Sequence, residues 1–370
     1  MLRNILILLF SGISICCFSF EAPNPAQPGV VYFGRENFLI EGTVFPDSVK
    51  ESPYDRLPFS WKEKVRKPVW DLSKSSAGLS VRFLTNSSAI HVKWSVLTNM
   101  TMNHMAETGI KGIDLYFSNH GNWQFVNTAR PTGKDNEALL VSRMNGQMRE
   151  YKMFLPLYDG LTNLEIGLDS GSVIMKPAKT AGKPIVFYGT SITQGGCASR
   201  PGMAHTNIIS RKLHTDCINF GFSGNGRMEE PIVELIAGID ARFYVIECLP
   251  NMSIDEVVKN VIPLVRIIRS KQPVTQIIFV ENPVYENASL DDTVRMDTDK
   301  KNAALMDQYR KLTGQGYKDI YSIGNEGTRE DDHEGTVDGV HLTDLGFMRY
   351  ADFLIGKFKE FGLVENELNR

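Results

Sequence analysis

The sequence has little cysteine and no excess of charge. Five cysteines occur in 370 residues, without a CxxC pair or a His/Cys cluster at metal-ligand spacing, so we expect no structural zinc and no bound metal. The formal net charge is -3 and no long block of like charges occurs, so a nucleic acid or an anionic membrane is not an expected partner. No repeat with a period of about 20–50 residues is visible, which argues against a repeat architecture. No motif indicates a cofactor.

The N-terminus carries a pronounced apolar run. Residues 1–20, MLRNILILLFSGISICCFSF, have one early cation, Arg3, then the apolar run, then Ser19 as a small residue near a plausible cut. This pattern predicts a secretory signal peptide cleaved between about Ser19 and Glu21. A membrane anchor is the alternative reading. We expect a secreted or periplasmic protein without stable membrane insertion once the signal is removed.

The cysteines that remain after this segment are odd in number. They are Cys197, Cys217 and Cys248. At least one thiol is therefore free unless it pairs between chains. The sequence does not decide whether two of them form a disulfide, and Cys217 and Cys248 lie in apolar runs where cysteine serves as a small hydrophobe.

The length of the chain and the pattern of its apolar residues divide it into two parts. At about 150 residues per domain, 370 residues suggest two domains. Residues 27–178 consist of short strand patterns and polar turns, without a convincing long helix. In residues 79–97, LSVRFLTNSSAIHVKWSVL, apolar side chains alternate with polar ones, as on a strand with one buried face. We predict an antiparallel β-sandwich of jelly-roll type.

Residues 184–370, which follow a linker at 175–184, show a different pattern of apolar residues. Apolar strand patterns alternate here with helical ones, and Ser253 with Glu256 forms a capping box that opens one helix. Strands that are apolar throughout and separated by helices indicate a parallel sheet covered on both faces. We therefore predict a five-stranded α/β domain. Its strands are PIVFYG, CINFGF, FYVIECL, TQIIFVEN and DIYSIG.

Polar residues follow these strands, where open α/β sheets gather their sites. Ser191 follows the first strand, Gly224 lies in the glycine-rich turn after the second, and Asn251 follows the third. Asp338 and His341 stand three apart between the fifth strand and the last helix. Since the carboxyl ends of parallel strands share one edge, these side chains should converge.

These residue types fit acyl transfer. Ser191 needs a general base, which His341 can supply while Asp338 orients the imidazole. The backbone N–H groups of Ser191 and Gly224 and the amide of Asn251 are the predicted oxyanion donors, and losing one such donor typically costs about 2.7–4 kcal/mol. Each signal is weak alone, because a serine in a strand-to-helix turn is most often a turn residue. Together and in this order they predict a serine nucleophile.

Other residues allow two interpretations. Arg200 lies close behind the serine and could bind a substrate carboxylate or sugar hydroxyl, or could belong to the turn before the next helix. His205 is predicted to be a helix-face residue. Four tryptophans could stack on a sugar ring, although core positions are commoner in a β-sandwich. They are Trp61, Trp70, Trp94 and Trp123.

At these positions the chain resembles the GDSL, or SGNH, esterases. Gly189–Ile192 resembles their first block, with threonine in place of the usual aspartate, and Asp338–His341 resembles their DxxH block. Gly224 and Asn251 match the second-block glycine and third-block asparagine. Gly112–Tyr116 resembles the Gly-x-Asp-Leu-Tyr signature of a β-sandwich that precedes some bacterial members. The resemblance implies a flavodoxin-like α/β/α SGNH hydrolase domain over 184–370, Ser-His-Asp catalysis and ester substrates.

These observations predict a secreted serine esterase that removes a short acyl group, chiefly acetyl, from a carbohydrate. The expected partner is a small-molecule or glycan ester. One alternative is an acylhydrolase for lysophospholipids or platelet-activating-factor-like lipids. Another is a catalytically inactive glycan-binding module, against which the complete set of serine, histidine and aspartate argues.

Overall fold

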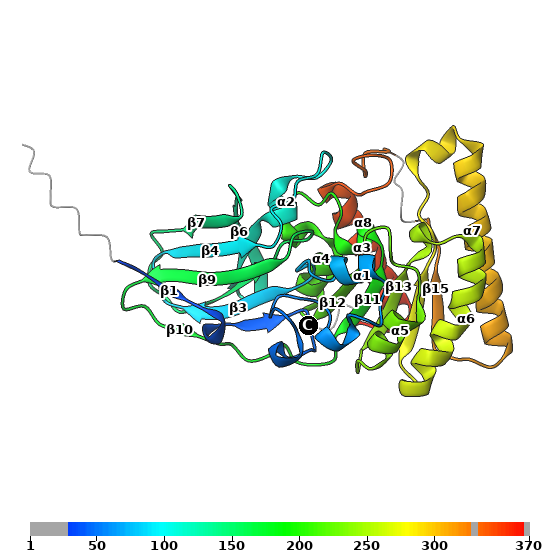
Figure 1. The fold of residues 1–370 in the computed structure, drawn as a ribbon, viewed down its shortest axis with the longest axis horizontal. Helices are drawn as coiled ribbons and strands as arrows, with labels where there is room; N and C mark the ends of the chain where they lie inside the picture. Colours follow the sequence, from blue (N-terminus) through cyan, green and yellow to red (C-terminus); the bar gives the residue numbers. More distant parts are fainter. Residues whose placement is uncertain (1–28, 327–331, 366–370) are drawn as a thin grey trace, which may run out of the picture.

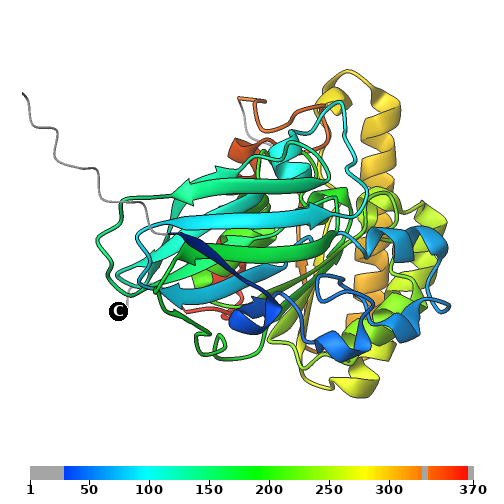
Figure 2. The same cartoon turned by 60° about the vertical axis from the view of Figure 1, so that its left-hand side comes forward.

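The computed structural model describes residues 29–326 and 332–365, so the predicted signal peptide at 1–20 lies outside the described residues. Two parts lie side by side: a pair of antiparallel sheets, and a parallel sheet between layers of helices (Figures 1 and 2). In the described ranges, no helix combines the length and the apolar character needed to cross a membrane.

The antiparallel part confirms the predicted sandwich. One sheet has the order β1-β9-β4-β7 and the other β10-β3-β8-β5-β6, with β2 paired to β3. The first sheet consists of β1 (Val30–Phe33), β9 (Leu161–Asp169), β4 (Ile90–Val96) and β7 (Asp135–Val141). The second consists of β10 (Ile174–Met175), β3 (Ser80–Thr85), β8 (Arg149–Phe154), β5 (Ile113–Asn119), β6 (Asn122–Ala129) and β2 (Leu39–Glu41).

Strand β4 shows why these residues form a sandwich. Its alternate side chains, from Ile90 to Val96, are buried between the sheets, while His91 and Lys93 are half-buried on the other face. β3 and β4 are consecutive but lie in opposite sheets, so the turn at 86–88 carries the chain across the sandwich. Two short helices also come from this half of the sequence, α1 (Lys67–Leu72) and α2 (Glu107–Lys111), and their buried apolar side chains belong to the core clusters of the parallel-sheet part.

The second part confirms the predicted five-stranded parallel sheet. Its order, β12-β11-β13-β14-β15, is that of a flavodoxin-like sheet. The strands are β11 (Ile185–Gly189), β12 (Cys217–Gly221), β13 (Phe243–Glu247), β14 (Gln276–Val280) and β15 (Ile320–Ile323).

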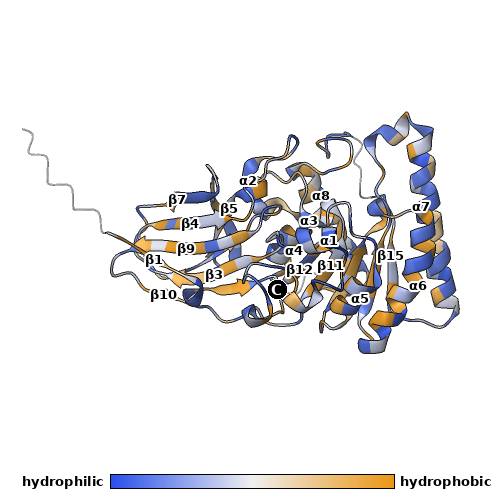
Figure 3. Cartoon of the chain, in the orientation of Figure 1, coloured by the Kyte–Doolittle hydropathy of each residue, from blue (hydrophilic) through white to orange (hydrophobic). Residues whose placement is uncertain are grey.

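Helices cover both faces of this sheet. One face packs against α4 (His205–Leu213) and α8 (Asp344–Glu360), and the other against α5 (Glu230–Ala237), α6 (Ile254–Lys271) and α7 (Asp292–Gly314). The predicted capping box of α6 is present, since the Ser253 hydroxyl accepts from the Glu256 N–H and the Glu256 carboxylate from the Ser253 N–H. Helix α7 is mostly hydrophilic in Figure 3, in keeping with its outer position in Figure 1.

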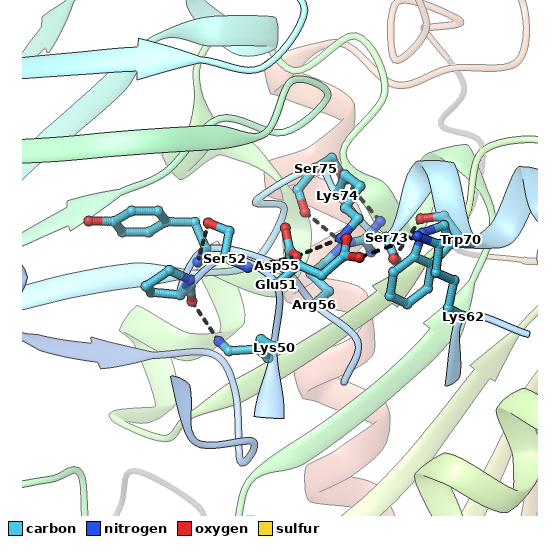
Figure 4. A network of polar contacts seen from close by, with 12 residues as sticks. Lys50, Glu51, Ser52, Asp55, Arg56, Lys62, Trp70, Ser73, Lys74 and Ser75 are labelled. Atoms are coloured by element: carbon cyan, nitrogen blue, oxygen red, sulfur yellow. Dashed lines mark hydrogen bonds and ion pairs between the residues drawn. The ribbon is translucent and has the colours of Figure 1, made fainter. Parts of the chain in front are cut away.

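A segment from the N-terminal part completes one face of the parallel sheet. Leu57, Val69 and Trp70 belong to the same buried apolar cluster as side chains of β11, β12 and β13. The buried guanidinium of Arg56 donates to the carbonyls of Asn219 (3.1 Å) and Gly221 (2.7 Å) on β12. Figure 4 shows the contacts of this segment around the Arg56 and Trp70 side chains. Residues 56–70 therefore fix the two parts to each other, and the predicted domain limits, 27–178 and 184–370, stay a prediction.

Candidate active site

Ser191 is the first residue of the short helix α3 (Ser191–Gln194), directly after β11. The Thr190 side chain accepts from the Ile192 N–H, and the Thr193 hydroxyl accepts from the Thr190 N–H at 3.2 Å. This reciprocal capping closes a tight turn. Gly189 is required here, because a Cβ at that position would lie 2.0 Å from the Thr193 hydroxyl oxygen. The serine hydroxyl is thereby held at the carboxyl edge of the sheet.

The structure brings Ser191, His341 and Asp338 into one line of hydrogen bonds. Ser191 Oγ lies 2.8 Å from His341 Nε2, and His341 Nδ1 lies 2.7 Å from Asp338 Oδ2. An ionised carboxylate only accepts, so Nδ1 carries the hydrogen and the Nε2 lone pair faces the serine hydroxyl. The imidazole is therefore oriented to receive a proton from Ser191.

Asp338 is suited to remain ionised. Partial burial raises its pKa, but hydrogen bonds from the backbone N–H groups of His341 (2.7 Å) and Val340 (3.1 Å) and from the imidazole outweigh that effect. The pKa of Asp338 consequently lies below its ordinary value. A carboxylate in this state can stabilise an imidazolium.

The predicted oxyanion donors lie in turns at the same edge. Gly224 has φ +69° and open space beside its Cα, so its backbone can approach a ligand. Gly226 packs against β11, because a Cβ on it would lie 1.9 Å from the Gly189 carbonyl oxygen. The Gly226 N–H donates to Asn251 Oδ1 at 3.2 Å, which leaves the amide N–H groups of Asn251 to other acceptors. This contact ties Asn251 to the turn that contains Gly224, and the oxyanion roles stay predictions.

Gln194 is a site residue that the sequence reasoning missed. Its side chain is buried, and its Oε1 accepts from the Ser223 N–H at 3.0 Å while its Nε2 donates to the Leu157 carbonyl at 3.1 Å. The last residue of α3 therefore connects the turn beside Gly224 to the N-terminal part. No local sequence signal distinguishes this glutamine from a surface one.

Glu247, the last residue of β13, was also missed. Its buried carboxylate accepts from the hydroxyls of Thr193 (2.9 Å) and Tyr350 (2.6 Å) and lies 3.2 Å from His205 Nε2. Burial raises the pKa of Glu247, but His205 and the hydrogen bonds outweigh it, so the pKa lies below its ordinary value. His205 is thus a core residue bound to Glu247, and the prediction of a helix-face position for it did not include this contact.

Arg200 and the Gly-x-Asp-Leu-Tyr segment meet between the two parts of the chain. Asp114 is buried on β5, and one of its oxygens accepts from Arg200 Nη1 (2.7 Å) and from the Gly202 N–H (2.8 Å). Arg200 also donates to the Tyr116 hydroxyl at 2.6 Å and lies 3.9 Å from the centre of the Phe125 ring. These contacts hold the loop after α3 against the sandwich. A substrate-binding role for Arg200 stays a prediction.

A small, mostly apolar cavity adjoins the nucleophile. It is lined by the residues on both sides of Ser191 and on both sides of His341, and its volume is about 30 Å³. Its lining residues are Thr190, Ile192, Glu247, Pro250, Val280, Glu281, Pro283, Val284, Tyr285, Thr336, Val340, Leu342 and Tyr350.

The cysteines of the described residues are all unpaired. Cys197, Cys217 and Cys248 are buried free thiols. Burial raises the pKa of the Cys197 thiol to about 12, and the nearby Asp338 charge adds to the effect. Cys197 is therefore not an activated nucleophile competing with Ser191.

Comparisons with known proteins agree with this architecture. Residues 182–359 match the model of the GDSL-like Lipase/Acylhydrolase family, and residues 30–174 match the N-terminus of SGNH-hydrolase-type esterases. No curated protein sequence matches the chain significantly.

Solved structures share both parts of the fold. A Bacteroides ovatus protein described as a GDSL-like lipase is 34% identical, with a TM-score of 0.87 over 91% of this chain and 99% of the other. A salicylyl-acyltransferase from a tetracycline biosynthetic pathway is 14% identical, with a TM-score of 0.75 over 92% and 99% of the two chains. An acetyl xylan esterase from Butyrivibrio proteoclasticus is 11% identical, with a TM-score of 0.59 over 91% and 100%. The last two likenesses concern the fold alone.

Proposed function

Because the chain belongs to the GDSL-like lipase and acylhydrolase family of ester hydrolases, we propose that it is an exported serine esterase that removes short acyl groups, chiefly acetyl, from carbohydrates. The observation that carries the proposal is the line of hydrogen bonds from Asp338 through His341 to Ser191, at 2.7 and 2.8 Å. Distances of this size are within reach of proton transfer.

In the first half of the reaction, Ser191 Oγ attacks the ester carbonyl carbon while its proton moves to His341 Nε2. Asp338 stabilises the imidazolium that forms. The carbonyl oxygen becomes an oxyanion, for which the N–H groups of Ser191 and Gly224 and the Asn251 amide are the donors. The intermediate collapses by breaking the ester C–O bond, and the leaving alcohol takes the proton from His341.

In the second half, water replaces the alcohol. His341 Nε2 accepts a proton from the water as its oxygen attacks the acyl-Ser191 carbonyl carbon. Collapse breaks the bond to Ser191 Oγ, which regains its proton from His341, and the carboxylic acid leaves. The same three residues therefore serve both half-reactions.

The size of the cavity beside Ser191 supports a short acyl group. A volume of about 30 Å³ has room for roughly two water-sized groups. An acetyl methyl fits such a space, which supports a short acyl group. The cavity is lined by the neighbours of Ser191 and His341 and not by these two residues themselves.

Export and the carbohydrate substrate are supported by other observations. The signal-peptide pattern at residues 1–20 supports export. The appended sandwich and the lack of an apolar lid segment in the sequence support a polar substrate. The acetyl xylan esterase named above shares the two-part fold, and we extend its substrate class to this chain by analogy.

The first test compares the parent with Ser191→Ala on p-nitrophenyl acetate, butyrate, octanoate and palmitate. The parent is expected to show its highest kcat/KM on acetate. Ser191→Ala should lower kcat on acetate by at least about 10³-fold, because the nucleophile is lost. Ser270→Ala, on the exposed side of α6, is the matched control and should retain the parent rate.

Each alternative predicts a different result. A rate of Ser191→Ala close to that of the parent would show that Ser191 is not the nucleophile. A steep preference for palmitate would favour the lipid acylhydrolase. If the parent protein hydrolyses no ester but binds glycan, the remaining interpretation is a catalytically inactive glycan-binding module. Release of acetate from acetylated xylan then tests the carbohydrate class directly.

A further inference from the structure

Four metal-binding donors meet beside the nucleophile, and two of them have no part in the proposed reaction. His104, Cys197, Asp338 and His341 each offer one ligand atom, and these atoms all lie within 4.8 Å of one another. They come from three separate segments: the loop between β4 and α2, the loop after α3, and the turn before α8. The His104 and His341 rings lie 5.7 Å apart, centre to centre.

The donor set fits zinc. Two imidazoles, one thiolate and one carboxylate form a four-ligand N/N/S/O shell of the kind that Zn²⁺ accepts in tetrahedral geometry. With bonds of about 2.0–2.3 Å, tetrahedral ligand atoms lie roughly 3.3–3.8 Å apart. The cluster therefore needs to contract by about 1 Å at its widest separation, and where His341 Nδ1 is the ligand its 2.7 Å contact with Asp338 Oδ2 has to open.

The surroundings hold the two additional ligands in place. His104 Nδ1 lies 2.9 Å from Asn103 Oδ1, and a hydrogen bond donated there leaves the His104 Nε2 lone pair for a metal. The next residue, Met105, is buried in the core of the parallel-sheet part and anchors the loop. Cys197 has φ +71° in the loop that follows Gly196. A Cβ on Gly196 would lie 3.2 Å from the His341 ring, so the loop packs directly against that ring.

A metal ion can reach the cluster from solvent. The side chains of His341 and Asp338 are 22% and 36% exposed. The Cys197 thiol forms the buried end of the cluster, and metal binding would displace its proton.

We propose that these four residues bind Zn²⁺ and that the bound ion switches the esterase off reversibly. Coordination through His341 Nε2 would occupy the lone pair that Ser191 needs. Coordination through Nδ1 would place the hydrogen on Nε2 and turn the acceptor into a donor. Either way His341 cannot take the serine proton. The inhibition rests on the proposed function, whereas the binding does not.

The first experiment titrates ZnCl₂ against hydrolysis of p-nitrophenyl acetate, with each variant measured against its own zinc-free rate. The parent should be inhibited and should recover on addition of EDTA. His104→Ala and Cys197→Ser should each raise the inhibitory zinc concentration at least about tenfold, since each removes a ligand. His120→Ala, in the turn between β5 and β6, is the matched control and should keep the parent's sensitivity. Equal sensitivity in all variants, or a parent unaffected by zinc, would overturn the proposal.

The second experiment reads binding without activity. Co²⁺ is titrated into the Ser191→Ala protein, where thiolate-to-cobalt absorption in the near ultraviolet and visible bands of tetrahedral cobalt are expected. Cys197→Ser should abolish the ultraviolet band, and excess Zn²⁺ should displace the cobalt. These spectra, together with a parent protein that hydrolyses no ester, would keep the site and reject the proposed function. Their absence in a folded protein would reject the site.

Discussion

The carboxylate of Glu247 is linked to Ser191 through the turn that carries the serine. It accepts the Thr193 hydroxyl, and that hydroxyl oxygen accepts the Thr190 N–H in turn. The contacts of Glu247 with His205 and Tyr350 bring helices α4 and α8 to the same point. Glu247 is therefore a positioning residue that sets where the serine hydroxyl lies relative to His341.

Glu247→Gln should lower kcat by roughly 10- to 100-fold with KM nearly unchanged, because a small misplacement of the serine slows the chemistry but not binding. Charged hydrogen bonds are lost as well, so the free energy of unfolding should fall by about 1.5–3 kcal/mol. Steady-state kinetics and urea unfolding measure both effects. Glu234→Gln, on the exposed face of α5, is the control. An unchanged kcat would show that the turn keeps its geometry without the carboxylate.

The sequence predicts the role of some site residues and not of others. The contact of Ser191 with His341 and Asp338 was predicted, because strand ends of a parallel sheet meet at one edge and Asp338 lies one helical turn from His341. Glu247, Gln194 and His104 were missed. The site residues that they contact lie between 29 and 237 positions away in the chain, and a lone polar residue carries no spacing signal. Of the four proposed zinc ligands, Asp338 and His341 were predicted as catalytic residues, whereas their proximity to His104 and Cys197 was missed because these residues are distant in the chain.

At the scale of elements, apolar patterning predicted all five strands of the parallel sheet. It did not predict helix α5, whose residues Glu230–Ala237 form only two turns and begin without a side-chain cap. The strands β3 and β4 were recognised, but their separation into opposite sheets was not predicted, since alternation gives the buried face and not the pairing partner.

The residue directly before β12 carries a carboxyl group that links stability to pH. Asp216 Oδ1 accepts from the Gly42 N–H at 2.9 Å. Burial, followed by the charge of Glu41, raises the pKa of Asp216 to about 7, against the opposing effect of Lys152. An aspartate in an unfolded chain titrates near ~3.9. The folded protein thus binds this proton more tightly, so the contribution of Asp216 to the free energy of unfolding falls as pH rises from about 4 to about 7.

Asp216→Asn should therefore gain stability relative to the parent as pH rises from 5 to 8, by at most about 1.4 kcal/mol per pH unit. The asparagine stays neutral and keeps an oxygen for the Gly42 N–H. Urea unfolding at both pH values measures the difference. Asp240→Asn, at an exposed ion pair with Lys183, should show no such gain. Parallel pH profiles for Asp216→Asn and the parent would contradict the assignment.

At the scale of the whole molecule, the two parts of the chain depend on each other. Trp70 lies in the core of the parallel-sheet part, 6% exposed, with Lys74 Nζ 4.3 Å from its ring centre. Trp70 precedes most strands of the sandwich in the sequence. A domain boundary between residues 178 and 184 therefore separates Trp70 from the parallel-sheet residues with which it forms a core.

Trp70→Ala should lower the free energy of unfolding by about 3–5 kcal/mol, the usual cost of removing a buried tryptophan. Far-ultraviolet circular dichroism in urea follows the loss. Trp123→Ala, at a half-buried position on β6, should cost distinctly less. A loss below about 1 kcal/mol for Trp70→Ala would show that the parallel sheet is stable without this segment.

The position of Leu57, Val69 and Trp70 in the core of the parallel sheet also has a consequence for synthesis on the ribosome. Strand β12, whose side chains belong to the same core, ends at Gly221, about 150 residues further along the chain. At about 5–20 residues per second, translation needs roughly 7–30 s to cover that distance. For that time the nascent chain carries an apolar segment whose packing partner has not yet been synthesised.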